Sequence, residues 1–194
     1  MEASLVYVAN SNVPHGGQGL FAKKDLEKDI IVSFYNGYRC ETKEEMEIYG
    51  KACPLKTEGT SDWEKMVKCT KYRINGLNEV LFDIPPWKDD LNLYNATLAH
   101  KINNAFWPKK NAEFGSVEHP RFGLIPCVKT IKNIKKGEEI FLDYGYDKNP
   151  SAEAKSTHQW YFDQKAQVQL ENRLAKEAVN AKQNTDSQYI HELF

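Results

Sequence analysis

The amino-acid sequence predicts a β-rich α+β domain in which many short strands precede a single long helix. Three observations lead to this prediction. Short apolar runs separated by turn residues fill the first 150 residues. Residues 156–182 then contain no proline or glycine and are rich in good helix formers. The length of 194 residues is enough for one sizeable domain and short for two, so we expect one main folded body.

The first part of the chain contains two strand candidates. Residues 5–9 are apolar and rich in strand-forming side chains, and the segment 10–19 after them predicts a loop because it is rich in breakers. Residues 30–35 are the second candidate. The dipeptide Asn36-Gly37 that follows predicts a tight hairpin, because both residues tolerate positive φ.

The middle of the chain gives helix, loop and strand signals in turn. Residues 42–45, Thr-Lys-Glu-Glu, have the form of a capping box, which predicts a short helix to about Tyr49. Residues 51–71 are lysine-rich without a clear period, and we interpret them as a surface excursion. Residues 80–84 predict a strand that stops at Pro85-Pro86, because neither proline can donate to a ladder.

The last strands and the helix complete the pattern. Residues 122–131 predict a longer strand, which Pro126 would place at a sheet edge or a bulge. Residues 135–139 predict a turn that leads into the apolar segment 140–142. The predicted helix is amphipathic, with an apolar stripe formed by Val168, Ala175 and Val179 and flanked by Leu170 and Leu174.

Composition and charge argue against several classes of protein. The 26 basic residues nearly balance the 27 acidic ones, so no global field draws the chain to nucleic acid or to a membrane. No apolar run approaches the roughly 20 residues that span a bilayer. Cys40, Cys53, Cys69 and Cys127 show no C-x-x-C spacing, so we expect reduced thiols and no metal site. Without a secretory leader in the sequence, we expect a soluble protein of the nucleus or cytoplasm.

Four segments contain residues suited to chemistry, and each also has a purely structural explanation. Segment 16–21 has three glycines in four positions, which form a turn or let backbone approach a ligand. Segment 100–105 has paired asparagines, which tie a turn or contact a ligand. Segment 143–147 has tyrosines at i and i+2, which share one side of an extended chain as core or as a polar slot. The tryptophan of segment 159–161 pins the helix to the core or stacks on a flat heterocycle.

Taken together and in this order, these segments resemble the SET-domain lysine methyltransferases, most closely the histone lysine monomethyltransferases that have MORN repeats. The similarity covers roughly residues 5–165, while the MORN repeats and the cysteine-rich flanking segments of many relatives are missing. The matching residues are Gly17-Gln18-Gly19-Leu20-Phe21-Ala22-Lys23, Ser33-Phe34-Tyr35-Asn36-Gly37, His100-Lys101 before Asn103-Asn104-Ala105, His119-Pro120-Arg121-Phe122-Gly123, Gly137-Glu138-Glu139-Ile140, Tyr144-Gly145-Tyr146-Asp147 and Trp160-Tyr161.

The resemblance implies a SET fold, in which several small sheets surround a threaded segment near the central motif. Residues 1–150 would form the SET domain, and residues 151–194 a helical segment that packs on the cofactor site. The implied cofactor is S-adenosyl-L-methionine, and the implied partner is a protein substrate, either a histone tail or another lysine-containing segment. We expect a monomer, with no direct nucleic-acid, membrane or metal partner.

The resemblance also implies the site residues. The implied cofactor-binding residues are Gly16, Gln18, His100, Lys101, Asn103, Asn104 and Trp160, with Trp160 against the adenine. Tyr144 matches the essential tyrosine of the family, and Tyr35 and Tyr146 match catalytic tyrosines in the wall of the lysine channel. Phe114 lies where the most similar members have another tyrosine. An alternative is a catalytically weak or inactive SET-fold module that binds a protein tail, because Asn104-Ala105 replaces the usual His-Ser.

Overall fold

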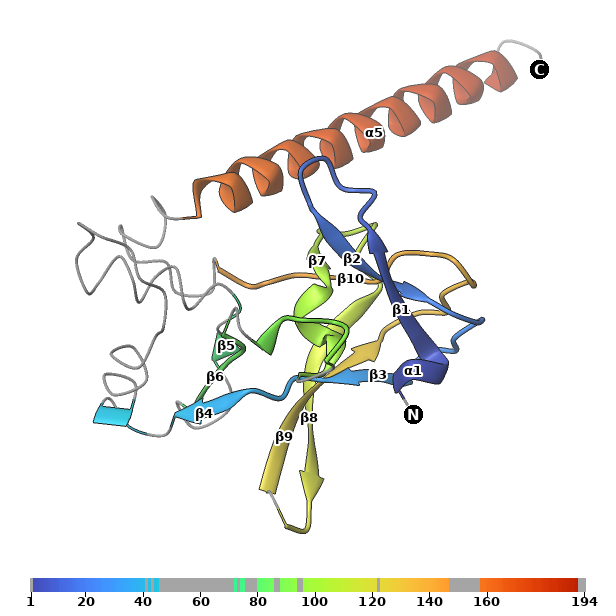
Figure 1. Ribbon diagram of the computed structural model, residues 1–194. Coiled ribbons are helices and arrows are strands. Elements are labelled where there is room, and N and C mark those ends of the chain that lie inside the picture. Colours follow the sequence, from blue (N-terminus) through green and yellow to red (C-terminus); the bar gives the residue numbers. More distant parts are fainter. Residues whose placement is uncertain are drawn as a thin grey trace. The chain divides into compact units, whose positions relative to one another are not determined.

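The computed structural model describes residues 2–40, 42, 44–45, 72, 74–75, 80–85, 88–93, 96–121, 123–146 and 158–191, with the side chains of the last range to residue 180 (Figure 1). The elements in chain order are α1 (Glu2–Leu5), β1 (Val6–Asn10), β2 (Gln18–Ala22), β3 (Ile31–Phe34), β4 (Tyr38–Cys40), β5 (Ile74–Asn75), β6 (Leu81–Asp83), the 3₁₀ helix η3 (Leu98–Lys101), β7 (Asn103–Asn104), β8 (Ala112–His119), β9 (Gly123–Thr130), β10 (Phe141–Leu142) and α5 (Gln159–His191). The predicted β-rich fold with a C-terminal helix is confirmed.

The chain divides into two compact units. The first unit consists of residues 1–105 and 109–142, and the second of residues 106–108 and 143–194. The strands all belong to the first unit, and α5 belongs to the second. The domain boundary expected at residue 150 lies outside the described residues and stays a prediction.

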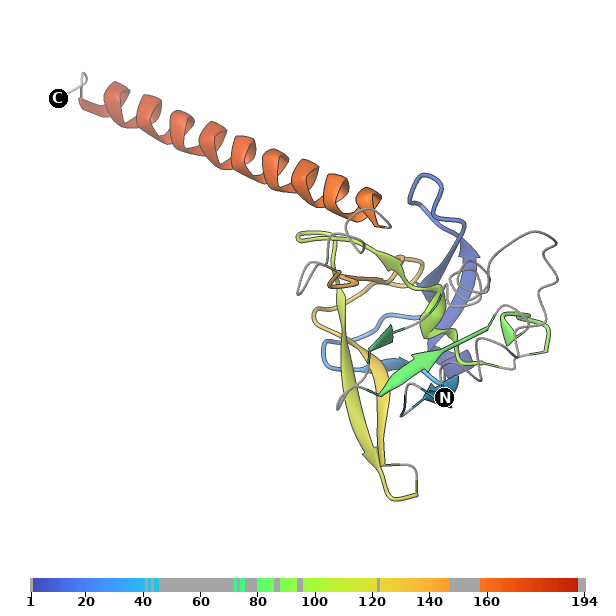
Figure 2. The same cartoon turned by 90° about the vertical axis from the view of Figure 1, so that its left-hand side faces the viewer.

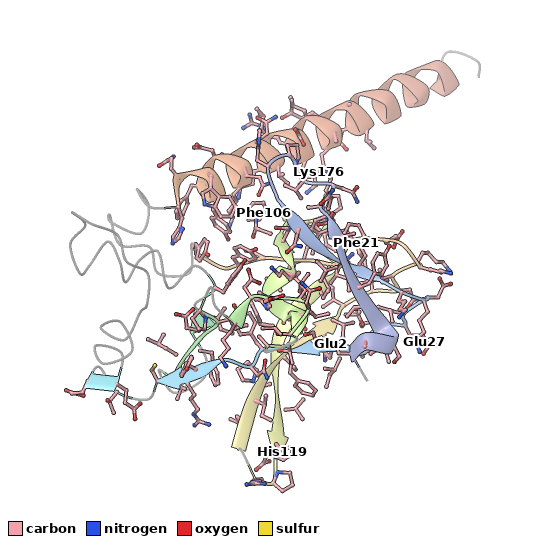
Figure 3. The ribbon with its side chains drawn as sticks, in the orientation of Figure 1. Glu2, Phe21, Glu27, Phe106, His119 and Lys176 are labelled. Carbon is pink, nitrogen blue, oxygen red and sulfur yellow. The ribbon has the colours of Figure 1, made fainter. Side chains whose placement is uncertain are left out.

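The described residues of the first unit form four small sheets. The strand orders are β1-β2, β10-β7, β3-β9-β8 and β4-β6-β5, and among these described strands the β7–β10 pair is parallel while the others are antiparallel. The long β8–β9 hairpin extends away from the other strands of this unit in both ribbon views (Figures 1 and 2). His119 lies at its tip (Figure 3).

The core of the first unit is aliphatic. Its most deeply buried aliphatic side chains come from β2, β3, β9 and β10, from residues next to β6 and η3, and from the segment between β9 and β10, because strands of several small sheets turn one face inward. These side chains are Leu20, Val32, Ile84, Ile102, Val128, Ile134, Ile140 and Leu142.

Several sequence predictions with local signals are confirmed. Strands occur where residues 5–9, 30–35, 80–84 and 122–131 predicted them, each with slightly different ends. The capping box is present, because the Glu45 N–H donates to Thr42 Oγ1 at 3.1 Å and the Thr42 N–H donates to Glu45 Oε2 at 3.4 Å. The rest of that predicted helix and the surface excursion at 51–71 lie outside the described residues.

The hairpin predicted at Asn36-Gly37 is wrong. The flanking strands pair elsewhere, β3 with β9 and β4 with β6. The Asn36 side chain instead accepts a hydrogen bond from the Thr97 N–H at 2.7 Å. Glycine at position 37 lets the backbone approach that of Asp83 closely, since a Cβ there would lie 2.2 Å from the Asp83 carbonyl oxygen.

Pro126 predicted an edge or a bulge, and the edge position is wrong, while the register of the β3–β9 pair shifts between Ile31 and Ser33. Strand β9 is the central strand of its sheet, and the β8–β9 register continues through the pairing of Pro126 with Ser116. The Pro126 carbonyl accepts from the Tyr35 N–H at 2.8 Å, so the side of proline that lacks a donor faces the end of β3. The ladder to β8 therefore loses no hydrogen bond.

Two further predictions need correction. The loop expected at 10–19 is shorter, because β2 begins at Gln18 and contains Gly19. Helix α5 continues past residue 182 to His191, and its predicted apolar stripe is not buried, since Leu170, Leu174 and Val179 are exposed. Pairs one turn apart stabilise this polar helix, including Gln159–Asp163 and Gln167–Glu171.

The described ranges contain neither a membrane-spanning helix nor a cluster of metal-binding side chains. Within them, no helix is long and apolar enough to cross a membrane. The same residues contain no group of three or more histidine, cysteine or acidic side chains placed to hold a metal ion.

We expect Gly37→Ala to destabilise the protein by about 1–3 kcal/mol, because the added methyl group forces the β4–β6 backbone apart. Thermal or urea unfolding measures this loss. The matched control is Gly115→Ala, where the new Cβ meets only Cys127 Sγ at an ordinary 3.6 Å. Equal stability of the two variants would contradict the close approach at Gly37.

Candidate active site

The glycine segment forms a closed turn between β1 and β2. The Ser11 N–H donates to the Gly17 carbonyl at 2.8 Å, and the Gly16 N–H donates to the Val13 carbonyl at 2.9 Å. Gly17 has φ +64°, which is the left-handed region that glycine adopts without strain. The turn itself is therefore the first reason for the glycines of this segment.

Glu139 holds this turn against the central motif. Its carboxylate is buried and accepts hydrogen bonds from Ser11 Oγ at 2.6 Å and from the Asn12 N–H at 2.8 Å. Asn103 Nδ2 donates to the same carboxylate at 3.2 Å and to the Gln18 carbonyl at 2.9 Å. A Cβ at Gly19 would lie 2.2 Å from Glu139 Oε1, so only glycine fits there. The structure thus brings together three predicted residues, namely Gly16, Gln18 and Asn103.

Asn104 and Ala105 lie beside the end of β10. Asn104 pairs with Leu142 in the parallel ladder, and the Ala105 N–H donates to the Leu142 carbonyl at 2.9 Å. Both side chains are buried. Main-chain hydrogen bonds therefore hold this segment against β10.

His100 and Lys101 belong to a polar cluster around Asp89, which we call the Asp89 cluster (Tyr72, Asp89, His100 and Lys101). Asp89 Oδ1 lies 2.5 Å from Lys101 Nζ and 2.7 Å from His100 Nε2, and Asp89 Oδ2 accepts from the Tyr72 hydroxyl at 2.9 Å. Lys101 Nζ also donates to Gln18 Oε1 at 2.8 Å. Sequence reasoning identified His100, Lys101 and Gln18 but missed Asp89 and Tyr72.

Burial and the neighbouring groups shift the pKa values of Asp89, His100 and Tyr72. Burial alone would raise the pKa of Asp89, but hydrogen bonds from Lys101 and then from His100 outweigh it, so the pKa lies below its ordinary value. Burial lowers the pKa of His100, against the opposing hydrogen bond from Asp89. Burial, together with the nearby Asp89 charge, raises the pKa of Tyr72. Asp89 is therefore ionised at neutral pH and forms an ion pair with Lys101.

Tyr35 and Phe114 form an aromatic wall in the first unit. Their rings meet edge to face with centroids 6.2 Å apart. The Tyr35 side chain is buried, and its hydroxyl donates to the Tyr72 carbonyl. The single O–H of Tyr35 is therefore engaged by backbone.

The second unit contains an aromatic cluster of Tyr144, Tyr146 and Trp160. The Tyr144 ring lies 5.6 Å from the Tyr146 ring and 6.2 Å from the Trp160 ring, and Tyr146 lies 6.3 Å from Trp160, all edge to face. Tyr146 also stacks on His158 at 4.0 Å, and burial raises the pKa of its hydroxyl. The two tyrosines, which the sequence predicted on one side of the chain, therefore have their rings in contact.

The sequence predicted an extended chain between the two tyrosines, and this prediction is wrong. Gly145 has φ +69°, and its N–H donates to Asp143 Oδ1 at 2.9 Å. Asp143 Oδ1 also accepts from the Tyr161 hydroxyl at 2.6 Å. Tyr161 is fully buried, while Trp160 is 48% exposed. The tyrosine is therefore the buried residue at the head of α5, and the tryptophan keeps an open face.

Residues 17–145 match the SET domain. The chain belongs to the SET-domain family. It is 32% identical over 165 residues to "Histone-lysine N-methyltransferase SETD7" from Halocynthia roretzi, a match that covers 84% of this chain and 38% of that protein. The chain thus spans less than half the length of this curated relative.

Solved structures share the SET fold with this chain. A SET8 protein from Cryptosporidium matches with a TM-score of 0.52 at 15% identity, over 72% of this chain and 57% of that one. The Chaetomium thermophilum polycomb repressive complex 2 bound to S-adenosylmethionine matches with a TM-score of 0.50 at 21% identity, over 80% of this chain and 17% of that one. At these identities, the likeness concerns the fold alone.

The predicted site residues and the side chains that they contact lie in two groups. The first unit contains the glycine turn, Gln18, Asn103, Asn104, the Asp89 cluster and the Tyr35–Phe114 wall. The second unit contains Tyr144, Tyr146 and Trp160. Asp89 and Tyr72 belong to none of the predicted motifs, and only the fold brings them to His100 and Lys101, which explains why they gave no signal of their own.

We expect the imidazole of His100 to titrate below 6.5 in an NMR pH titration, because burial disfavours its charged form. Asp89→Asn should lower this pKa further, since Asp89 opposes the shift and Lys101 adds to it. The folded ring binds a proton more weakly than the unfolded one, so its stabilising contribution is present above pH 6.5 and is lost as the pH falls through the lowered pKa. The spectrum of His100→Gln assigns the resonance, and a raised pKa would contradict the expectation.

Proposed function

We propose that this protein is an S-adenosylmethionine-dependent protein-lysine N-methyltransferase. The main support is the aromatic cluster, in which Tyr144, at the position of the essential tyrosine of the family, meets Tyr146 and Trp160. Membership of the SET-domain family and the similarity to a histone-lysine N-methyltransferase agree with this activity.

The residues present fit S-adenosylmethionine. The exposed indole of Trp160 offers a flat surface for adenine. The exposed Gln18 and the partly exposed Asn103 offer amide groups, next to the backbone of the glycine turn, for the methionine end. When bound, this cofactor supplies an electrophilic methyl group on a sulfonium. The residues that would hold it are Gly16, Gln18, His100, Lys101, Asn103, Asn104 and Trp160.

The substrate lysine must be neutral to act as a nucleophile. A free lysine has a pKa near 10.4, so roughly one side chain in a thousand is neutral at pH 7. Aromatic walls disfavour the charged ammonium by desolvation, and Tyr35, Phe114, Tyr144 and Tyr146 are the side chains that would form them. No strong base is required if water carries the proton away.

Tyr144 would orient the amine of the substrate. Alignment of the two reacting groups contributes on the order of 7–11 kcal/mol in well-oriented reactions. The Tyr35 hydroxyl already donates to the Tyr72 carbonyl, so it would offer the amine only acceptor lone pairs. We assign orientation to Tyr144 and wall formation to Tyr35 and Tyr146.

The finer assignments follow the family. We propose that the substrate is a lysine of a histone tail or of another protein, that the enzyme acts as a monomer in the nucleus or cytoplasm, and that it contributes to chromatin regulation. The match to members with MORN repeats belongs to the same proposal. Asn104-Ala105 in place of His-Ser favours one alternative, a weak or inactive SET-fold module that binds a protein tail.

We expect Tyr144→Phe to abolish methyl transfer while S-adenosylhomocysteine still binds, because the ring stays and only the orienting hydroxyl is lost. Transfer of labelled methyl to bulk histones measures activity, and tryptophan fluorescence quenching measures binding. Tyr7→Phe is the matched control, since Tyr7 only stacks on Phe21 in the first unit. Turnover of Tyr144→Phe at the wild-type rate would refute the role of this residue, and an inactive wild type that binds the ligand would favour the binding module.

We expect the wild-type protein to proceed past monomethylation, because Phe114 leaves space where a tyrosine hydroxyl would crowd the methylated amine. Phe114→Tyr should restrict the product to monomethyl-lysine. Mass spectrometry of a substrate peptide at exhaustive reaction measures both. Monomethyl product alone from the wild type would count against this role of Phe114.

A further inference from the structure

We propose that Asp89 is a positioning residue of the cofactor site, which acts through Lys101 to fix the orientation of the Gln18 amide. This inference rests on the proposed function, because it assigns a role in cofactor binding to a residue outside the family motifs. We call the Asp89–Lys101 and Lys101–Gln18 contacts together the Asp89 relay. In this proposal, the relay directs the N–H groups of the Gln18 amide toward the cofactor.

The first step of the relay is the ion pair. Lys101 Nζ lies 2.5 Å from Asp89 Oδ1, and the Lys101 side chain is 6% exposed. A buried ammonium requires a counter-charge, and removal of one partner of such a pair is strongly unfavourable. The Tyr72 hydroxyl donates to the other oxygen of Asp89 and so fixes the plane of the carboxylate. Asp89 therefore determines where the Lys101 ammonium lies.

The second step is the orientation of an amide. Lys101 Nζ donates to Gln18 Oε1 at 2.8 Å. An ammonium has only donors, so it selects the oxygen of the Gln18 amide and leaves its two N–H groups directed away from Lys101. Gln18 follows the glycine turn, and its backbone carbonyl accepts from Asn103 Nδ2. The relay therefore presents donors suited to a carboxylate or carbonyl acceptor.

The ion pair also explains why Lys101 would not bind an anion directly. Its charge is already neutralised by Asp89, and its stem is buried near the Tyr72 ring, with Nζ 5.7 Å from the ring centroid. The recognition group exposed at this point is the uncharged Gln18 amide. The relay thus uses a buried charge pair to orient a neutral side chain.

The first experiment tests the ion pair without any ligand. Amine-reactive labelling followed by mass spectrometry should modify Lys101 at least about tenfold more slowly than Lys135, whose side chain is 74% exposed. Asp89→Asn should increase labelling of Lys101, while the neighbouring Asp90→Asn, the matched control, should leave it unchanged. Fast labelling of Lys101 in the wild type would overturn the inference whether or not the protein is a methyltransferase.

The second experiment tests the effect on the site. Asp89→Asn should weaken S-adenosylhomocysteine binding by calorimetry, and raise the KM for S-adenosylmethionine, by about tenfold, with a smaller change in kcat. Gln18→Glu should lose the same affinity yet keep Lys101 protected, because the oxygen facing the ammonium remains. Asp90→Asn should bind as the wild type does.

A double-mutant cycle separates positioning from general damage. Because Asp89 acts through Lys101, the double variant Asp89→Asn/Lys101→Met should bind S-adenosylhomocysteine no more weakly than Lys101→Met alone. Additive losses would overturn the relay. A wild type with a protected Lys101 that binds no S-adenosylhomocysteine would instead overturn the proposed function and, with it, the role of the relay in cofactor binding.

Discussion

The carboxylate of Glu139 is the interaction on which the first unit depends most. Charged groups are buried only where hydrogen bonds replace water, and Glu139 receives them from Ser11, Asn12 and Asn103, which come from two segments distant in sequence. One side chain thereby holds the glycine turn against the central motif. Gly19 packs against the same carboxylate, so the buried Glu139 can occupy its position only if residue 19 is glycine. The glycine turn, Gln18 and Asn103 are held together because this carboxylate is satisfied.

Local signals predicted much of the fold, and long-range pairing decided the rest. The strands at β1, β3, β6 and β9 and the capping box depend on neighbouring residues, so the sequence predicted them correctly. The hairpin at Asn36-Gly37 failed because Gly37 serves close approach to Asp83 rather than a positive φ. Pro126 failed as an edge signal because its donorless side faces the end of β3. Neither outcome is encoded near the residue concerned.

The candidate site shows the same division. Ordered motifs predicted Gln18, Asn103, Tyr144 and Trp160, and the structure brings these residues together within each unit. Asp89 and Tyr72 belong to no motif, and they matter only because the chain returns them to His100 and Lys101. Glu139 was visible in sequence but was interpreted as part of a turn. A single sequence therefore does not reveal a polar residue that contacts a motif residue only in the folded chain.

The departure at Asn104-Ala105 can be judged from where these residues lie. Their backbone pairs with β10 through main-chain hydrogen bonds that asparagine and alanine make as histidine and serine would. The backbone pairing of this segment therefore does not require the usual His-Ser. The change alters the side-chain groups beside the proposed cofactor site, since Asn104 retains an amide and Ala105 has no hydroxyl. Under the proposed function, the departure bears on cofactor affinity, and the orienting role of Tyr144 is independent of it.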